Sequence, residues 1–279
     1  MFKIPPALIQ WTISQISPHM KAPSNGLKGQ LAMYIMQTFN PPSIHEAVKR
    51  LELKNTDTFL EIGAGHGESL KAMIDLNERY HKNMKNALTE TESTSSTVFT
   101  AETQPDTEIS AATSSSVINY IPKRVILIEI SPKFEQRIHQ LIQNEILPRN
   151  LFSSPIELYN NDCISMTYLQ TDSIDTIFGF NLIYFLHPLQ DYLVEMKRVL
   201  KPGGKVVFGC KFGSLPNKGE SEDFVNVDKE DICNAMEKVG FVGVRAKTVV
   251  VGENPMMNYI EIQGFKLKEK ENQELQSKL

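Results

Sequence analysis

Short apolar runs alternate with amphipathic stretches from Thr58 almost to the end of the chain. The run RVILIEI at 124–130 is nearly continuously apolar, which is typical of a strand that is covered on both faces. The stretch 132–146 follows it with helical periodicity and begins with a proline, which a helix tolerates in its first turn. This alternation of strand and helix predicts an α/β fold with a doubly wound, mostly parallel sheet.

The same pattern locates seven strands and the helices that connect them. We expect strands at 58–62, 124–130, 156–159, 174–180, 205–210, 241–251 and 256–265, and helices at 67–80, 132–146, 189–200 and 229–239. No helical segment separates the last two strands, so we expect them to form an antiparallel pair at the C-terminal end of the sheet.

Residues 1–52 show helical periodicity with breaks at 23–26 and 40–42, where Pro, Asn and Gly gather. Ser43 followed by Glu46 has the spacing of a capping box, so we expect a helix to start after Ser43. The predicted organisation is an N-terminal helical cap at 1–52, a main domain at 53–268 and a charged tail at 269–279.

An insertion is predicted within the main domain at 83–121. Its segment 89–116 is rich in Ser and Thr, contains acidic residues and no Lys or Arg, and shows no periodicity. Such a composition predicts disorder. Closing a longer loop costs only about 0.6 kcal/mol per doubling of its length, so the domain can carry this insertion.

Composition excludes several classes of partner and compartment. The formal net charge of −4 gives no reason to expect binding to nucleic acid or to an anionic membrane through bulk charge, although a local basic patch stays open. The three cysteines are far apart without the spacing of a zinc site, so we expect no metal. No apolar run approaches about 20 residues, and the N-terminus lacks a signal-peptide pattern, so a cytoplasmic location is expected.

The stretch LEIGAGHGE at 60–68 contains the candidate chemistry. Its glycines, Gly63, Gly65 and Gly67, form G-x-G-x-G, whereas the dinucleotide fingerprint requires G-x-G-x-x-G and would place its third glycine where Glu68 stands. Glu61 and Glu68 make the loop acidic, which suits a cationic ligand better than a pyrophosphate. A tight strand–helix turn without a ligand is the alternative.

This acid followed by alternating glycines resembles the first motif of the class I S-adenosylmethionine-dependent methyltransferases. The stretch YNNDCISMTYLQTDSIDTIFGFNLIYFL at 159–186 is similar to the middle of the methyltransferase type 11 group, and YLVEMKRVLKPGGKVVFG at 192–209 resembles its helix, turn and fifth strand. The resemblance covers about 57–210 without the insertion, and more loosely extends to 265. It implies a Rossmann-like sheet, S-adenosylmethionine as cofactor and methyl transfer as the reaction.

Glu129 meets an independent requirement of such a site. An acid that accepts hydrogen bonds from ribose hydroxyls is expected about 20 residues after the glycines. Glu129 lies 62 residues after Gly67, and leaving out the 39 residues of the insertion reduces this separation to 23. The corrected spacing supports both the insertion and the ribose role.

The resemblance also implies the remaining site residues. Asp162 would bind the adenine amino group with Cys163 beside the ring, although Asp162 could equally form a turn. Tyr184 and His187 are the candidates for a catalytic group, with a core aromatic and a helix cap as their alternatives. The implied cofactor-binding set is Glu61, Gly63, Ala64, Gly65, Gly67, Glu129, Ile130, Asp162, Cys163 and Asn181.

We therefore expect methyl transfer from S-adenosylmethionine to a small-molecule or lipid-like acceptor, with no nucleic-acid partner. Two alternatives stay open: a catalytically silent S-adenosylmethionine-binding module, and an NAD(P)-dependent oxidoreductase. The sequence indicates neither the acceptor nor the oligomeric state.

Overall fold

The fold is built on one seven-stranded sheet in a computed structural model that describes residues 6–94, 121–215 and 222–268. The strand order is β3-β2-β1-β4-β5-β7-β6, with β7 antiparallel to both of its neighbours and the other pairs parallel. The strands are β1 (Thr58–Ile62), β2 (Arg124–Ile128), β3 (Glu157–Tyr159), β4 (Ile174–Phe180), β5 (Leu200–Cys210), β6 (Phe241–Val249) and β7 (Tyr259–Lys266). The predicted fold class, including the antiparallel C-terminal pair, is confirmed.

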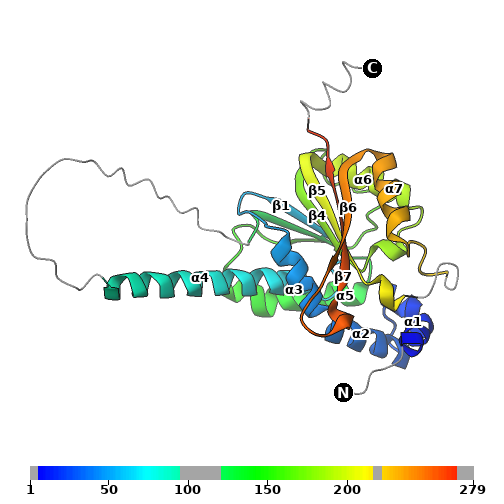
Figure 1. Cartoon of the computed structure of the whole chain (residues 1–279), viewed down its shortest axis with the longest axis horizontal. Helices are drawn as coiled ribbons and strands as arrows, with labels where there is room; N and C mark the ends of the chain where they lie inside the picture. Colours follow the sequence, from blue (N-terminus) through cyan, green and yellow to red (C-terminus); the bar gives the residue numbers. More distant parts are fainter. Residues whose placement is uncertain (1–5, 95–120, 216–221, 269–279) are drawn as a thin grey trace, which may run out of the picture.

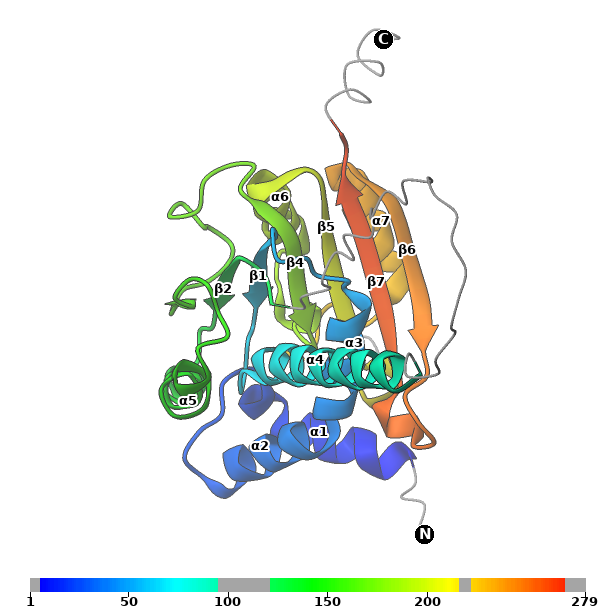
Figure 2. The same ribbon diagram turned by 90° about the vertical axis from the view of Figure 1, so that its left-hand side faces the viewer.

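Helices cover both faces of this sheet, which makes it doubly wound (Figures 1 and 2). One hydrophobic cluster joins the sheet to α3 (Pro41–Arg50), α4 (Glu68–Thr94) and α5 (Pro132–Leu141). A second cluster joins it to α6 (Leu189–Val199) and α7 (Lys229–Val239). Burial on both sides explains why β1, β2 and β4 are nearly continuous apolar runs.

The remaining helices, α1 (Pro6–Lys21) and α2 (Leu27–Phe39), lie at one end of the molecule in both views (Figures 1 and 2). They lie at the carboxyl ends of the parallel strands, and we call them the cap together with α3, which continues from this end along one face of the sheet. Side-chain contacts fasten it to the main domain: Ser17 Oγ donates to Asp223 Oδ2 at 2.6 Å, and Lys133 Nζ donates to the Ser24 carbonyl at 2.7 Å.

Several boundaries differ from those predicted: β5 begins at 200 instead of 205, β6 ends at 249 instead of 251, and β7 covers 259–266 instead of 256–265. The helix expected to end at residue 80 continues to Thr94, because Leu76, Tyr80 and Met84 extend the helical spacing of its half-buried side. The second strand ends at Ile128 instead of 130. Residues 83–94, predicted to belong to the disordered insertion, are therefore helical, and the prediction of disorder is wrong for them. Residues 95–120 of the predicted insertion, and the tail 269–279, lie outside the described residues.

The predicted capping role of Ser43 is wrong. α3 begins at Pro41, and two prolines in the first turn supply the φ angle that a helix start needs. Ser43 is instead fully buried, and its Oγ donates to the carbonyl of Met257 at 2.7 Å. This hydroxyl therefore joins the cap to the loop before β7.

Over the part of the chain that the structure describes, no helix combines the length and the apolar character that a bilayer crossing requires.

A paired ion bridge between α3 and β7 allows a test of how the cap is held. Arg50 Nε and Nη2 donate to the two oxygens of Glu261 at 2.8 and 2.9 Å, and the Glu261 side chain is only 9% exposed. Arg50→Met removes the cation and leaves a buried carboxylate, so we expect the free energy of unfolding to fall by about 3 kcal/mol in urea titrations.

The matched control is Arg149→Met, which removes an equally short ion pair with Glu78 whose side chains are 45% and 53% exposed. Water screens this pair, so a loss below about 1 kcal/mol is expected. Equal losses in the two variants would contradict a special contribution of the Arg50 pair.

Candidate functional site

The glycine loop lies between β1 and α4, at the carboxyl edge of the sheet where α/β folds bind ligands. Gly63, Gly65 and Gly67 all have positive φ angles of 69°, 54° and 73°. A Cβ on Gly67 would lie 2.7 Å from the terminal Cδ2 of Leu141, so Leu141 would have to shift in addition to the strain from the positive φ. A Cβ on Gly65 would meet nothing closer than 4.0 Å, so open space lies beside this residue.

Glu129, just after β2, holds the loop in place. Its Oε2 accepts from the Gly65 amide and its Oε1 accepts from the Ser131 amide, both at 2.8 Å. The side chain is 4% exposed, and burial raises the pKa of its carboxyl, while the backbone donors oppose that rise. The arithmetic that placed Glu129 beside the glycines thus corresponds to a direct contact.

Glu61 is the second buried acid at this edge, at the end of β1. It is 3% exposed, and burial raises the pKa of its carboxyl to about 8, with a hydrogen bond from Ser69 Oγ acting in the opposite direction. A carboxyl with this pKa changes its charge readily when a cation approaches.

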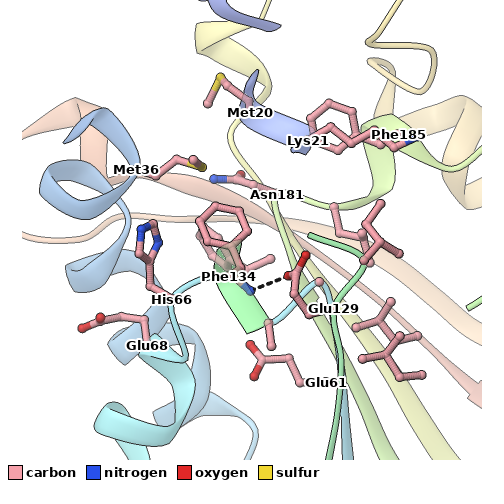
Figure 3. A pocket seen from close by; sticks show the side chains of 18 of the residues that line it. Met20, Lys21, Met36, Glu61, His66, Glu68, Glu129, Phe134, Asn181 and Phe185 are labelled. Atoms are coloured by element: carbon pink, nitrogen blue, oxygen red, sulfur yellow. Dashed lines mark hydrogen bonds between the residues drawn. The ribbon is translucent and has the colours of Figure 1, made fainter. Parts of the chain in front are cut away.

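Glu61, Gly63, Gly65 and Glu129 line one cavity, which we call the glycine-loop cavity, whereas the predicted site residue Gly67 is not part of its lining (Figure 3). Met20 and Met36 of the cap lie across it from Glu61. Its lining includes four acidic side chains, Glu61, Glu68, Glu129 and Asp162, against a single lysine, Lys21, among the described residues. An acidic cavity of this kind favours a ligand that carries positive charge.

A second cavity, which we call the cap cavity, adjoins the first. The two share Met20, Met36, Asn40, Asn181 and Phe185. Most of its other walls are apolar: Ile13, Tyr34, Ile35, Phe39, Leu215, Phe224 and Met256. Helix α2 reaches this cavity through Tyr34 and Met36, whereas Met33 is buried in the core.

A hydrogen-bonded cluster separates the cavities. Asn181, directly after β4 with a φ of 53°, donates through Nδ2 to Asn40 Oδ1 of the cap at 3.2 Å. Its Oδ1 accepts from Tyr184 Oη at 2.8 Å and from the Lys211 amide at 3.2 Å. Lys211 Nζ donates to the carbonyls of Phe39 and Met256, and burial lowers the pKa of this amine to about 8.

Most of the predicted site residues meet around these cavities. Ile130, Cys163 and Ala64 line the glycine-loop cavity with the residues already described. Asp162 also forms the turn that was its alternative role: Oδ1 accepts from the Ile164 amide and Oδ2 from Tyr192 Oη. Tyr184 lines the cap cavity, is 2% exposed and has its pKa raised by burial.

Two histidines lie differently from expectation. His187 is exposed and lines neither cavity, so the structure does not bring it to the other candidates. A histidine in a surface loop ordinarily faces solvent, but His66 is half-buried with its ring 4.7 Å from that of Phe134, and burial lowers the pKa of its imidazole to about 4. It is therefore neutral at pH 7 and adds no positive charge.

Sequence reasoning missed Phe134, Asn40 and Lys211. Lys211 directly follows β5, and Phe134 lies in the first turn of the helix after Glu129. The rule that ligands bind beyond the carboxyl ends of strands points to both positions. No local pattern marks Asn40, whose partner is 141 residues away.

Comparisons with known proteins concern the family of one segment and the fold of the chain. Residues 109–208 match a family model described as a methyltransferase domain. Among curated proteins, none matches this chain. The match begins after the glycine loop, which the insertion separates from the rest of the domain.

The fold is similar to several solved structures. A chain from the complex between the Haloferax volcanii Trm112 methyltransferase activator and a methyltransferase is 13% identical, with a TM-score of 0.56, 91% of this chain and 98% of that chain covered. An S-adenosylmethionine-dependent methyltransferase from Aquifex aeolicus is 16% identical, with a TM-score of 0.50 and coverages of 95% and 100%. The [4+2]-cyclase SpnF is 12% identical, with a TM-score of 0.52 and coverages of 95% and 98%.

Proposed function

We propose that this chain, which has the fold of the class I S-adenosylmethionine-dependent methyltransferases and matches the methyltransferase domain family over residues 109–208, binds S-adenosylmethionine in the glycine-loop cavity. The acidity of that cavity carries the proposal. Its four carboxylic acids face one lysine, and an approaching ammonium would favour ionisation of Glu61, so the cavity suits an ammonium and a sulfonium better than the two phosphates of NAD.

Each cofactor group has a candidate partner. The ammonium would be held by Glu61 and the methionine backbone would approach Gly63 and Gly65, where side chains are missing. The ribose hydroxyls would donate to Glu129, whose oxygens each accept one amide and retain a further lone pair. The adenine would lie between Ile130 and Cys163, with Asp162 at its amino group.

Methyl transfer would cross the boundary between the two cavities. The reaction is an in-line displacement, in which the acceptor attacks the methyl carbon as the bond to sulfur breaks. Orientation of the acceptor and exclusion of water can supply much of the rate. The apolar walls of the cap cavity favour an acceptor with an apolar body, small or lipid-like.

We assign no general base. The Tyr184 hydroxyl donates to Asn181 and accepts from the Lys211 amide at 2.5 Å, so its proton is engaged. Burial raises the pKa of this hydroxyl, so it stays protonated at neutral pH and does not serve as a general base. Tyr184 is instead a positioning residue that fixes Asn181 at the boundary. His187 receives no role.

Titration calorimetry with S-adenosylmethionine and, separately, with NAD tests the cofactor assignment. Binding of the first without the second is expected, and the reverse result would overturn the proposal in favour of an oxidoreductase. Incubation of metabolite and lipid extracts with labelled methyl donor then separates the enzyme from a silent module. Cofactor binding without transfer to any extract would support the silent module. The similarity to the [4+2]-cyclase SpnF is one example of this fold in a protein named for another reaction.

The substitution Gly65→Asp should weaken S-adenosylmethionine binding at least tenfold while the fold is retained. The new side chain would enter the open space beside residue 65. It would also place a carboxylate next to that of Glu129, and calorimetry on the purified variant measures the loss.

The control is Gly252→Asp, which has a similar φ of 61° and nothing within 4 Å of its added Cβ, but lies in the loop between β6 and β7. The control should bind normally. Unchanged affinity in Gly65→Asp would remove Gly65 from the site, and equal loss in both would show a general effect of the substitution.

A further inference from the structure

The outer side of α2 carries large apolar side chains that the described residues leave uncovered. Leu27, Leu31 and Tyr34 are 85%, 42% and 64% exposed. Their separations of four and three residues place them on one side of the helix. Gly29, Ala32 and Met33 on the opposite side are buried against the protein. We call the exposed set, Leu27, Leu31 and Tyr34, the α2 apolar face.

The charge around this face differs from that of the whole chain. Residues 1–45 contain three lysines and no Asp, Glu or Arg, whereas the whole chain has a net charge of −4, so the remainder carries −7. Lys28 is exposed and directly follows Leu27, and Lys21, at the end of α1, is exposed as well and lines the glycine-loop cavity. Lys133 adds a third cation, because its Nζ contacts the Ser24 carbonyl in the α1–α2 connection.

The face also has a direct connection to the proposed acceptor site. Tyr34 belongs both to the α2 apolar face and to the lining of the cap cavity. The cap lies at one end of the molecule in both views, with the C-terminal end of β7 on the opposite side (Figure 2). Among the described residues, α2 therefore lies at an outer end of the domain.

We propose that the α2 apolar face docks on the surface of an anionic lipid bilayer, from which a lipid-like acceptor enters the cap cavity beside Tyr34. Leucine and tyrosine side chains would enter the boundary between headgroups and acyl chains, and the flanking lysines would face the anionic headgroups. The acceptor part rests on the proposed function, while the docking part does not.

Co-sedimentation of the full chain with lipid vesicles tests the docking. We expect binding to vesicles of phosphatidylcholine mixed with phosphatidylserine, weaker binding to phosphatidylcholine alone, and release from the mixed vesicles at high salt. Leu27→Ser/Leu31→Ser should reduce the partition coefficient at least tenfold, because two leucines no longer enter the bilayer. Lys28→Glu should weaken binding to the mixed vesicles only.

The matched control is Val194→Ser. Val194 is 52% exposed and belongs to α6, and this helix lies far from the cap in both views. This variant should partition like the unmodified chain. The docking proposal would be overturned if the unmodified chain failed to bind the mixed vesicles. It would also be overturned if Leu27→Ser/Leu31→Ser bound them as strongly as the control does. Either result would stand even if a protein partner bound α2.

Calorimetry with S-adenosylmethionine on the same variants separates the two proposals. Normal cofactor affinity with lost vesicle binding is the result expected. Vesicle binding by a chain that does not bind S-adenosylmethionine would support docking and overturn the proposed function.

Discussion

Replacing Glu129 by alanine is expected to weaken S-adenosylmethionine binding about a hundredfold or more. A charge-assisted hydrogen bond contributes about 1.5–3 kcal/mol, and the proposed site gives Glu129 two ribose hydroxyls. The variant also leaves the Gly65 amide without the oxygen that it contacts at 2.8 Å, so the loop loses a fixed position. Calorimetry measures the affinity, and circular dichroism establishes that the fold is retained.

The cofactor itself supplies the control for the ribose role. An S-adenosylhomocysteine analogue without the 2′ and 3′ hydroxyls should bind the unmodified chain much more weakly than S-adenosylhomocysteine. Glu129→Ala should bind both compounds about equally. If the variant still discriminated between them as strongly as the unmodified chain, the ribose would be held by another residue.

The elements that the sequence locates best are those whose ends have local signals. β1, β4 and α7 begin and end at the residues predicted. For α7 the reason is visible: the Asp228 side chain accepts from two amides of the first turn, and Gly240 ends the helix with a φ of 90°. α4 lacks such an end signal after Tyr80, so its end was predicted too early.

The residues of the candidate site likewise fall into two groups, those that the sequence locates and those that only the structure shows. Glu61, Glu129 and the glycines follow strands whose order and spacing the chain itself encodes, so counting residues was sufficient to bring them together. Asn40 contacts Asn181 only because the cap docks at a particular angle, through contacts such as that of Arg50 with Glu261. No periodicity or motif in residues 1–52 specifies that angle, so the shape of the cap cavity required the structure.

The second large effect that we predict concerns protons taken up or released when the cofactor binds. Burial places the pKa of Glu61 at about 8 in the free protein, so at pH 7 this carboxyl is mostly protonated. An α-amino group has a pKa of about 8 as well. In the proposed complex, an ammonium would face the Glu61 carboxylate, which lowers the pKa of the acid and raises that of the amine.

Binding at about pH 6.5 should therefore release close to one proton from Glu61, and binding at about pH 9.5 should take up close to one proton on the cofactor amine. Affinity should be greatest near pH 8, between these limits. Calorimetry in pairs of buffers with different ionisation enthalpies counts the protons. Glu61→Gln should abolish the release at pH 6.5 and weaken binding at least tenfold.

The stability of the free protein provides an independent check on Glu61. Its folded pKa is raised from the ordinary 4.5, so its contribution to stability is complete below pH 4.5 and is lost as the pH rises to about 8. The difference in unfolding free energy between the unmodified chain and Glu61→Gln should fall across that window, by at most about 1.4 kcal/mol per pH unit. Because Gln does not titrate, a difference that stays constant from pH 4.5 to 8 would show that Glu61 is ionised in the free protein. Glu61 would then meet the ammonium already ionised, and any proton release at pH 6.5 would have to arise from another group.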